Sequence, residues 1–345
     1  MAMGKFARLG VEDAQIPVTD LVRRTSYHPE SVPLVFEADR DIDLPAWVSA
    51  HRDELRADLH RYGALLLRSP GKPSYGKPSF DAIVAALSEE LVDYRGGAAI
   101  RSRVDRTTYT ASEYPNDLDI RQHSEFCYSH DWPMLLFFYC DVAPWDRGQT
   151  PLTDNRRLMR EIPQDIRSEF ARRGLLYVRG YGYNRTWQRS YETGSREEVE
   201  AICAAEGRRV EWIGGDQLRT YEERPAIARH PVTGEEVWFN YAHGFHISRM
   251  DAGIRAALST SSADTDDQLW PNNVYWGDGS EIDPATISVV NDVVEACTVQ
   301  FDWQEGDTLI VDNMLCAHGR RPYTGPRRIL LKMAESYADL AAERS

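Results

Sequence analysis

Two short motifs, far apart in the chain, each lie beside an apolar segment that is typical of a buried strand. His123 and Glu125 precede the apolar residues 133–142, and His318 follows the apolar residues 307–312. Side chains two positions apart on a strand point to the same face of a sheet, so His123 and Glu125 are expected to face the same way. A second histidine from a distant strand can then complete the set. The pattern predicts paired strands that bring the two motifs together.

The three side chains form a known type of ligand set for a metal ion. Two imidazoles and one carboxylate on one face hold non-haem Fe(II) and leave coordination positions open for oxygen chemistry. A His-x-Glu pair alone is frequent by chance, and most of the nine histidines are expected to be ordinary hydrogen-bonded residues. The metal hypothesis therefore depends on all three ligands meeting.

Apolar runs and helix-start signals alternate along the chain, without an internal repeat or a shift in composition. Short β-branched or aromatic runs predict strands, and capping residues followed by Pro or Glu predict helix starts. Strands are expected at residues 32–38, 63–68, 133–142, 175–181, 298–303, 307–312 and 328–334, with a hairpin at 225–241. Helices are expected at residues 43–62, 80–91, 154–161, 195–205 and 283–295, and one more begins at Pro163.

This order of elements predicts a mainly β protein with flanking helices. We expect one domain over residues 1–345, built as an antiparallel barrel or jelly roll. Residues 1–30 are polar and are expected to be irregular. Residues from about 155 to 300 are expected to hold helical insertions within the jelly roll.

The composition excludes several classes of function. A net charge of −14 argues against binding to a phosphate backbone. Five cysteines without a Cys-x-x-Cys pair disfavour a disulfide framework or a thiolate zinc site. The longest apolar run is too short to cross a membrane, and the first residues lack a signal-peptide pattern. We expect a cytoplasmic protein that binds a small molecule, not nucleic acid or a membrane, with a homo-oligomer left open.

A second group of histidines offers an alternative metal site. His243 and His246 are three residues apart, and His230 would add a third ligand for zinc. No His-Glu-x-x-His sequence supplies a general base beside them, so they are expected to line a pocket mouth or pack below it. A Gly-x-Ser-x-Gly turn and the glycine motifs of nucleotide-binding sites are absent from the sequence.

Taken together, the motifs resemble those of the taurine-dioxygenase-like (TauD/TfdA) family of Fe(II)- and 2-oxoglutarate-dependent oxygenases. Within it, the chain is similar to the natural-product branch that includes the syringomycin-pathway aspartyl hydroxylase. The resemblance covers roughly residues 25–337 and implies a double-stranded β-helix, the cupin-like jelly roll. It is carried by His-Ser-Glu at 123–125, Gly-Gln-Thr-Pro at 148–151, Trp-Phe-Asn at 238–240, Gly-Asp-Gly at 277–279 and Asp-Asn-Met-Leu-Cys-Ala-His-Gly-Arg at 312–320.

The resemblance implies roles for individual residues. His123, Glu125 and His318 match the catalytic iron ligands of the family. Arg328 matches the arginine whose guanidinium fork binds the distal carboxylate of 2-oxoglutarate, and Thr150 matches the threonine that hydrogen-bonds the same group. Many relatives have Asp in place of Glu125, although Glu occurs in a natural-product subset. A carboxylate here argues against halogenation, because related halogenases have Ala or Gly there to make room for chloride.

The resemblance gives fewer indications of which residues contact the substrate. Lys332 matches a position where relatives present a cation to an anionic substrate group. Strand alternation places Arg328 and Lys332 on one face and Arg327 on the other, and a β-bulge would reverse this assignment. Asn240 and Tyr128 are further candidates for substrate contacts.

The resemblance implies an oxygenase that uses Fe(II), 2-oxoglutarate and O2 to hydroxylate or desaturate an unactivated C–H bond. The expected substrate is a small amino acid or an amino-acid-derived metabolite, free or carrier-bound, in natural-product biosynthesis. Two alternatives stay open. One is a non-catalytic cupin-like protein that binds a metal or a small acid, and the other is a zinc hydrolase.

Overall fold

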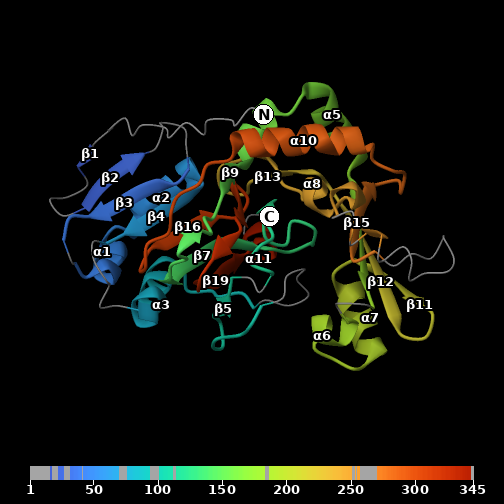
Figure 1. Cartoon of the computed structure of the whole chain (residues 1–345), viewed down its shortest axis with the longest axis horizontal. Helices are drawn as coiled ribbons and strands as arrows, with labels where there is room; N and C mark the ends of the chain where they lie inside the picture. The colour runs from blue at the N-terminus through green and yellow to red at the C-terminus, as the bar shows by residue number, and fades with distance from the viewer. Residues whose placement is uncertain are drawn as a thin grey trace.

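A large sheet forms the centre of the molecule (Figure 1). The computed structural model describes residues 16–17, 22–26, 32–40, 42–69, 76–93, 101–111, 114–182, 186–250 and 270–342, together with Gly253, Arg255 and Ala256. The eight strands of the sheet follow the order β1-β2-β3-β4-β16-β7-β19-β5, and all neighbours are antiparallel except β3 and β4. Their bounds are β1 Ile16–Pro17, β2 Val22–Ser26, β3 Leu34–Ala38, β4 Ala64–Arg68, β5 Tyr109–Thr110, β7 Pro133–Val142, β16 Thr308–Asp312 and β19 Arg328–Ser336.

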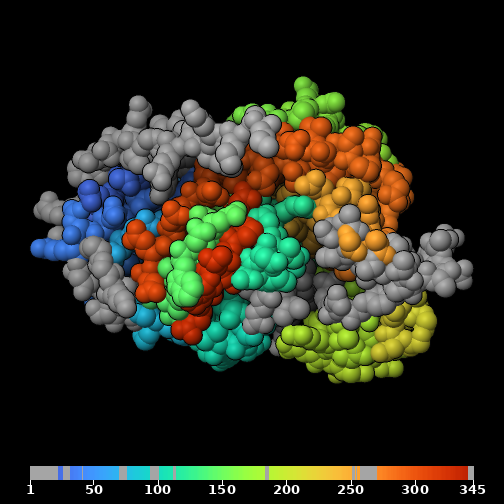
Figure 2. Space-filling view, in the orientation of Figure 1, coloured from blue at the N-terminus to red at the C-terminus, as the bar shows by residue number. Residues whose placement is uncertain are grey.

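The central strands are buried on both faces, which explains their nearly continuous apolar sequences. On β7, Leu136 and Phe138 point into the larger of the two cores, whereas Leu135 and Phe137 point into the other. The second core is covered by α1 (Leu44–Ala50), α2 (Arg52–Tyr62) and α3 (Gly76–Leu87). Figure 2 shows the blue N-terminal elements and the yellow-green elements α6, α7 and β11 at opposite ends of this face of the molecule.

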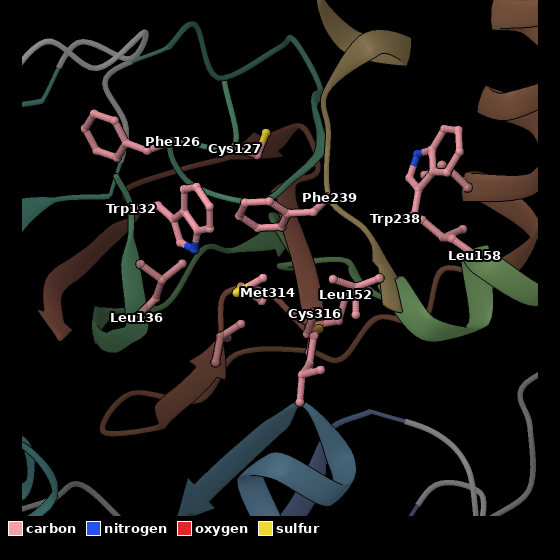
Figure 3. Packing of buried hydrophobic residues seen from close by; sticks show 14 of the residues in the cluster. Phe126, Cys127, Trp132, Leu136, Leu152, Leu158, Trp238, Phe239, Met314 and Cys316 are labelled. Carbon is pink, nitrogen blue, oxygen red and sulfur yellow. The ribbon is translucent and has the colours of Figure 1, made fainter. Parts of the chain in front are cut away.

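A small antiparallel sheet lies across the larger core. It consists of β6 (Ile120–His123), β17 (Cys316–Arg320) and β9 (Leu152–Asp154), with β17 in the middle. Leu152 and Cys316 from this sheet pack in the same core as Leu136 of β7 (Figure 3). Two sheets with apolar residues between them therefore hold the region that contains the histidine motifs.

A third sheet extends the molecule on the side away from α1 and α3 (Figure 1). Its order is β11-β12-β10-β15, all antiparallel, and α6 and α7 pack on it around a small core of their own. The bounds are β10 Leu175–Tyr181, β11 Arg209–Ile213, β12 Gln217–Arg224, β15 Asn272–Trp276, α6 Trp187–Tyr191 and α7 Arg196–Ala205. The remaining elements are β8 Asp146–Arg147, β13 Ile227–Arg229, β14 Glu236–Trp238, β18 Tyr323–Thr324, α4 Asn155–Glu161, α5 Gln164–Arg173, α8 Ala242–Phe245, the 3-10 helix η1 Ile247–Arg249, α10 Pro284–Cys297 and α11 Tyr337–Ala342.

Three predicted helix starts are confirmed in detail. The carboxylate of Asp154 accepts two backbone N–H groups at the start of α4, and the carboxylate of Asp283 accepts the N–H of Ala285 at the start of α10. The hydroxyl oxygen of Ser195 accepts the N–H of Glu198 at the start of α7. Each side chain satisfies backbone donors that the helix itself leaves without partners.

The expected mainly β architecture with flanking helices is confirmed, but several elements differ. The helix expected at residues 43–62 is interrupted at His51, and residues 298–303 form no strand apart from one bridge between Val299 and Leu152. Residues 22–26, expected to be irregular, form β2. The strands β11, β12 and β15 were not predicted, because they carry many polar and charged residues. In the described part of the chain, no helix is long and apolar enough to cross a membrane.

Candidate metal centre

The two motif histidines are neighbours across a strand pair. His123 is the last residue of β6, and it pairs directly with His318 of β17. Their ring centroids are 4.5 Å apart. One ligand atom from each of His123, Glu125 and His318 lies within 4.8 Å of the others, and among the described residues this is the one such group of three or more His, Cys, Asp or Glu side chains. The structure therefore brings together all three residues that the sequence offers as metal ligands.

Glu125 reaches this position by a turn and not by strand alternation. The strand β6 ends at His123, and Glu125 lies in the turn that follows, next to Phe126 with a positive φ of 58°. The side chain of Asn313 fixes this turn. Its Oδ1 accepts the N–H of Glu125 at 2.7 Å, and its Nδ2 donates to the carbonyl of Glu125 and to that of Pro133, both at 2.8 Å. A buried amide thus holds the backbone of the candidate ligand.

Neighbouring polar side chains support the same turn. The Nδ2 of Asn155 donates to the hydroxyl of Ser124 at 3.0 Å and to the carbonyl of Met314 at 2.8 Å. Gln122, on the other side of His123, donates to the hydroxyl of Thr298 at 2.7 Å. These bonds join the turn to α4 and to the segment before β17, so the candidate ligands sit on rigid surroundings.

Both histidines are in the form that binds a metal. The Nδ1 of His123 lies 2.8 Å from the carbonyl oxygen of Arg121, which can only accept, so Nδ1 carries the proton and Nε2 is the lone-pair nitrogen. That Nε2 lies 3.9 Å from Oε2 of Glu125. The Nδ1 of His318 is buried and has no hydrogen-bond partner among the described residues. Burial lowers the pKa of His123 and lowers that of His318 further, so both rings are neutral at pH 7.

A buried arginine that the sequence did not single out lies against the carboxylate. Arg101 Nη2 is 2.5 Å from Oε2 of Glu125, and both side chains are only 3% exposed. Arg101 lies near Arg103 and Arg106 in a polar segment, and nothing in that pattern distinguishes it. Only the folded structure shows that one of the three is inside the site.

The structure places Arg328, the residue expected to bind the keto-acid carboxylate, at the surface. Arg328 is 60% exposed and forms an ion pair with Asp141 on the surface. Residues 328, 330, 332 and 334 of β19 face the helices α1–α3 or solvent, and a register shift follows Arg328. Arg327 is half-buried on the other side, where its Nε donates to the carbonyl of Gly148 at 3.0 Å.

The surroundings of Arg327 are suited to an anion. Burial, together with the charge of Arg320, lowers the pKa of Arg327 to about 10, so it remains a cation at neutral pH. No carboxylate of the described residues lies within ion-pair distance of it. Thr150, two residues after Gly148, is buried, and its hydroxyl oxygen accepts the indole N–H of Trp303 at 3.0 Å. A hydroxyl that already accepts one hydrogen bond keeps its own proton to donate.

The structure argues against substrate roles for Lys332 and Asn240. Lys332 is buried on the helix-facing side of β19, with Nζ 2.8 Å from the carboxylate of Asp81 in α3. The amide of Asn240 bonds the backbone carbonyl of Ala226 and the N–H of Ala242, so it shapes the start of α8. Both expectations relied on sequence position alone.

Tyr128 is a buried core residue in this structure. Its ring stacks on Phe245 with centroids 5.2 Å apart, and Phe245 in turn lies 5.0 Å from Tyr241, which is 5.3 Å from the ring of His123. A contact between Tyr128 and a substrate stays a prediction. The aromatic row does place an apolar wall beside the candidate metal centre.

The alternative zinc site does not form. The Nε2 of His243 donates to the carbonyl of Gln122 at 2.9 Å, and Nδ1 of His246 bonds the hydroxyl of Ser248 at 2.8 Å. His230 donates to the carboxylate of Asp312 at 3.0 Å. Each ring has its own hydrogen-bond partner, and these three do not converge on a common point among the described residues.

The fold and the site are typical of β-sheet metalloenzymes whose metal is bound by two histidines and one carboxylate. Residues 25–334 match the family model described as "Taurine catabolism dioxygenase TauD, TfdA family", and the chain belongs to this family. It is therefore a 2-oxoglutarate-dependent dioxygenase that requires iron and O2. The resemblance drawn from the motifs is confirmed.

Two relatives match over nearly their whole length. The chain is 32% identical over 315 residues to the "Dapdiamide synthesis protein DdaC" of Enterobacter agglomerans, which covers 90% of this chain and 93% of that protein. It is 30% identical over 343 residues to the "Clavaminate synthase-like protein At3g21360" of Arabidopsis thaliana, covering 92% and 98% of the two chains.

Solved structures show the same fold at low sequence identity. PvcB from Pseudomonas aeruginosa superposes with a TM-score of 0.55 at 14% identity and covers 94% of this chain and 95% of its own. PvcB is described as an Fe, alpha-ketoglutarate dependent oxygenase from an isonitrile synthetic pathway. AAD-2, solved with Mn(II) and N-oxalylglycine, gives a TM-score of 0.51 at 12% identity, over 91% of this chain and 96% of that one.

Proposed function

We propose that this enzyme oxidises an unactivated C–H bond of a small amino acid or an amino-acid-derived metabolite, by hydroxylation or desaturation, in natural-product biosynthesis. The observation that carries the proposal is the convergence of His123, Glu125 and His318 within 4.8 Å of one another. The description of one relative as a dapdiamide synthesis protein supports the natural-product setting.

In this proposal, His123, Glu125 and His318 hold Fe(II). The donor set fits the metal, because two neutral imidazoles and one carboxylate are a common set for ferrous oxygenases. Iron, together with 2-oxoglutarate and O2, supplies the oxidising power that breaks the C–H bond. The protein holds the metal ligands in position. Asn313 fixes the backbone of Glu125, and the carbonyl of Arg121 fixes the tautomer of His123.

Arg327 and Thr150 are the residues that we assign to the distal carboxylate of 2-oxoglutarate. Arg327 replaces Arg328 in this role, because its guanidinium is half-buried, charged and without a carboxylate partner in the described chain. Thr150 donates its hydroxyl proton while its oxygen accepts from Trp303. A planar guanidinium fork matches a carboxylate in shape as well as in charge.

The fold supports a more specific description. We assign the large sheet and the small β6-β17-β9 sheet to the two layers of a double-stranded β-helix, with the β10–β15 sheet and its helices inserted between strands of that core. The whole chain then forms one oxygenase domain. Carrier attachment of the substrate, the oligomeric state and a cytoplasmic location stay predictions.

The direct test is aerobic turnover of the purified protein with Fe(II), ascorbate and 2-oxoglutarate. Candidate amino acids and short peptides are added singly, and mass spectrometry looks for products that gain one oxygen atom or lose two hydrogens. Succinate formation is expected even without the true substrate. No succinate with any candidate would favour a cupin-like binding protein, and activity with zinc in the absence of oxygen would favour a hydrolase.

A further inference from the structure

Arg101 places a buried positive charge beside all three candidate ligands. Its Nη2 lies 2.5 Å from Oε2 of Glu125, and its side chain is almost fully enclosed. The same charge contributes to lowering the pKa of His123 and of His318, after the larger effect of burial. Glu125 is proposed to bind a metal dication, so it has no need of a second cation. The presence of Arg101 therefore calls for another explanation.

The charges of the completed site point to a missing anion. Under the proposed function, a ferrous ion and the 2-oxoglutarate dianion cancel, and Glu125 cancels Arg101. Arg327 then adds a positive charge for which the described residues offer no carboxylate within ion-pair distance. Buried charges are strongly unfavourable unless they are paired. A carboxylate group of the substrate, placed beside these arginines, would offset this charge.

We propose that Arg101 is a specificity-determining residue that binds a carboxylate of the substrate, which places the substrate among small carboxylic acids, amino acids included. The proposal rests on the proposed function and names the substrate class of the same site. A guanidinium presents five N–H donors in a planar fork, so one arginine can bind Glu125 and a second carboxylate together. An acid bound there lies beside the metal ligands, where a C–H bond close to its carboxylate meets the reactive centre.

The other candidates for this role lie elsewhere. Lys332 pairs with Asp81 on the far side of the sheet, and Arg328 pairs with Asp141 at the surface. Arg121 lies within β6, but its Nη1 is directed at the carbonyl of Arg249. Of these cations, Arg101 is the one in contact with a candidate ligand.

The experiment compares Arg101→Gln and Arg101→Lys with Arg103→Gln as a matched control. Arg103 lies two residues along the chain, is 40% exposed, and is 3.7 Å from Asp93. Each protein receives Fe(II), ascorbate, 2-oxoglutarate and competing pairs of probes. A pair consists of an L-amino acid, or another small carboxylic acid, and the primary amide of the same skeleton. The readout is the ratio of kcat/KM for the acid to kcat/KM for the amide, by mass spectrometry.

The wild-type protein and Arg103→Gln are expected to favour the acid. Arg101→Gln is expected to lower the acid-to-amide ratio by about 10- to 100-fold, because a charged hydrogen-bonded pair becomes a neutral one. Arg101→Lys is expected to restore part of the preference, since the charge returns without the planar fork.

A purely structural role for Arg101 gives a different result. If Arg101 only positions Glu125, then Arg101→Gln slows acid and amide by the same factor, the ratio stays unchanged, and the proposal is overturned. Equal use of acids and amides by the wild-type protein overturns it as well, while leaving the oxygenase assignment intact. Absence of succinate from every protein instead overturns the proposed function itself.

A binding measurement covers the case in which Arg101→Gln is inactive. Mn(II) binding, followed by electron paramagnetic resonance, tests whether the variant still takes up a metal. Calorimetry with Mn(II), 2-oxoglutarate and the acid that the wild-type protein prefers then gives affinity without turnover. The acid is expected to bind at least about 10-fold more weakly to Arg101→Gln than to Arg103→Gln. Equal affinities, or loss of Mn(II) binding alone, would reject a direct contact.

Discussion

Arg327 immediately precedes β19 and Arg328 is its first residue, yet their side chains have different surroundings. Arg328 reaches solvent and Asp141, whereas Arg327 turns toward Gly148 and the region of Thr150. The sequence could not decide between them, because β19 is apolar on both faces. Ile329 and Leu331 enter one core and Leu330 enters the other, so no alternation of polar and apolar residues marks the inner face.

Substituting each arginine in turn tests whether Arg327 or Arg328 binds the carboxylate of 2-oxoglutarate. Arg327→Gln is expected to raise the KM for 2-oxoglutarate by about 10- to 100-fold, since the carboxylate loses a charged donor. Arg328→Gln is the matched control and is expected to leave that KM within about twofold, because a surface ion pair contributes little. Both values come from initial rates of succinate formation. A larger effect in Arg328→Gln would return the role to the residue that the motif spacing favoured.

A second prediction concerns the carboxylate of Glu125. Glu125→Ala is expected to lose stoichiometric metal binding and to abolish substrate oxidation, because only two imidazoles remain. Metal analysis after dialysis and Mn(II) titration provide the measurements. Glu236→Ala, at an exposed site paired with Arg229, should behave like the wild-type protein. Retention of tightly bound metal in Glu125→Ala would remove this carboxylate from the ligand set.

Among the elements near the site, the turn after β6 was not predicted from the sequence. The His-x-Glu spacing predicts strand alternation, but the strand stops at His123. The amide of Asn313, far away in sequence, makes two hydrogen bonds to the backbone of Glu125 and a third to the carbonyl of Pro133. Such a long-range contact leaves no local pattern. The helix caps, by contrast, depend on residues close in sequence and were predicted correctly.

Substitution at Asn313 should show how much the turn contributes. Asn313→Asp keeps an acceptor for the N–H of Glu125 but loses both donated bonds, so the apo protein is expected to lose about 2–4 kcal/mol of unfolding free energy. Asn313→Ala is expected to lose at least as much. Urea denaturation of the metal-free protein provides the measurement. A loss below about 0.5 kcal/mol in both variants would show that the turn is held by other contacts.

The cap of α7 gives a contrasting prediction for an element away from the site. Ser195→Ala is expected to lower the unfolding free energy by about 1 kcal/mol, because the N–H of Glu198 loses its acceptor. Ser195→Thr retains the hydroxyl and should stay close to the wild-type protein. Both variants are expected to keep wild-type kcat and KM. Changed kinetics in either one would show that the third sheet is coupled to the metal centre.

For the whole molecule, the central strands and the fold class were predictable, and the pairing of the motifs was not. Continuous apolar runs identify β7, β10, β16 and β19, since these strands are buried. The strand β11 lies at the edge of the third sheet and β12 lies next to it, and both carry many polar and charged residues, so their sequences lack the apolar runs of the central strands. The direct pairing of His123 with His318 depends on sheet register, which the sequence does not display.

Buried histidines make the stability of the whole fold sensitive to acid. Burial lowers the pKa of His243 to about 3, and the unfolded chain binds that proton near pH 6.5. Its contribution is fully present above pH 6.5 and is lost as pH falls toward 3, because the unfolded state takes up the proton first. The apo protein is expected to lose unfolding free energy over this range. His243→Gln should flatten the slope by up to one proton, as measured by urea denaturation at several pH values. An unchanged slope would show that His243 is not the group responsible.

The pairing of His123 with His318 determines when the metal site can form during synthesis of the chain. An ion bound there joins β6 to β17, a strand that the ribosome makes much later. A growing chain cannot assemble this site until the ribosome has passed residue 318. Iron loading then follows the pairing of β6 with β17, and the bound ion stabilises a topology that the chain has already reached on its own.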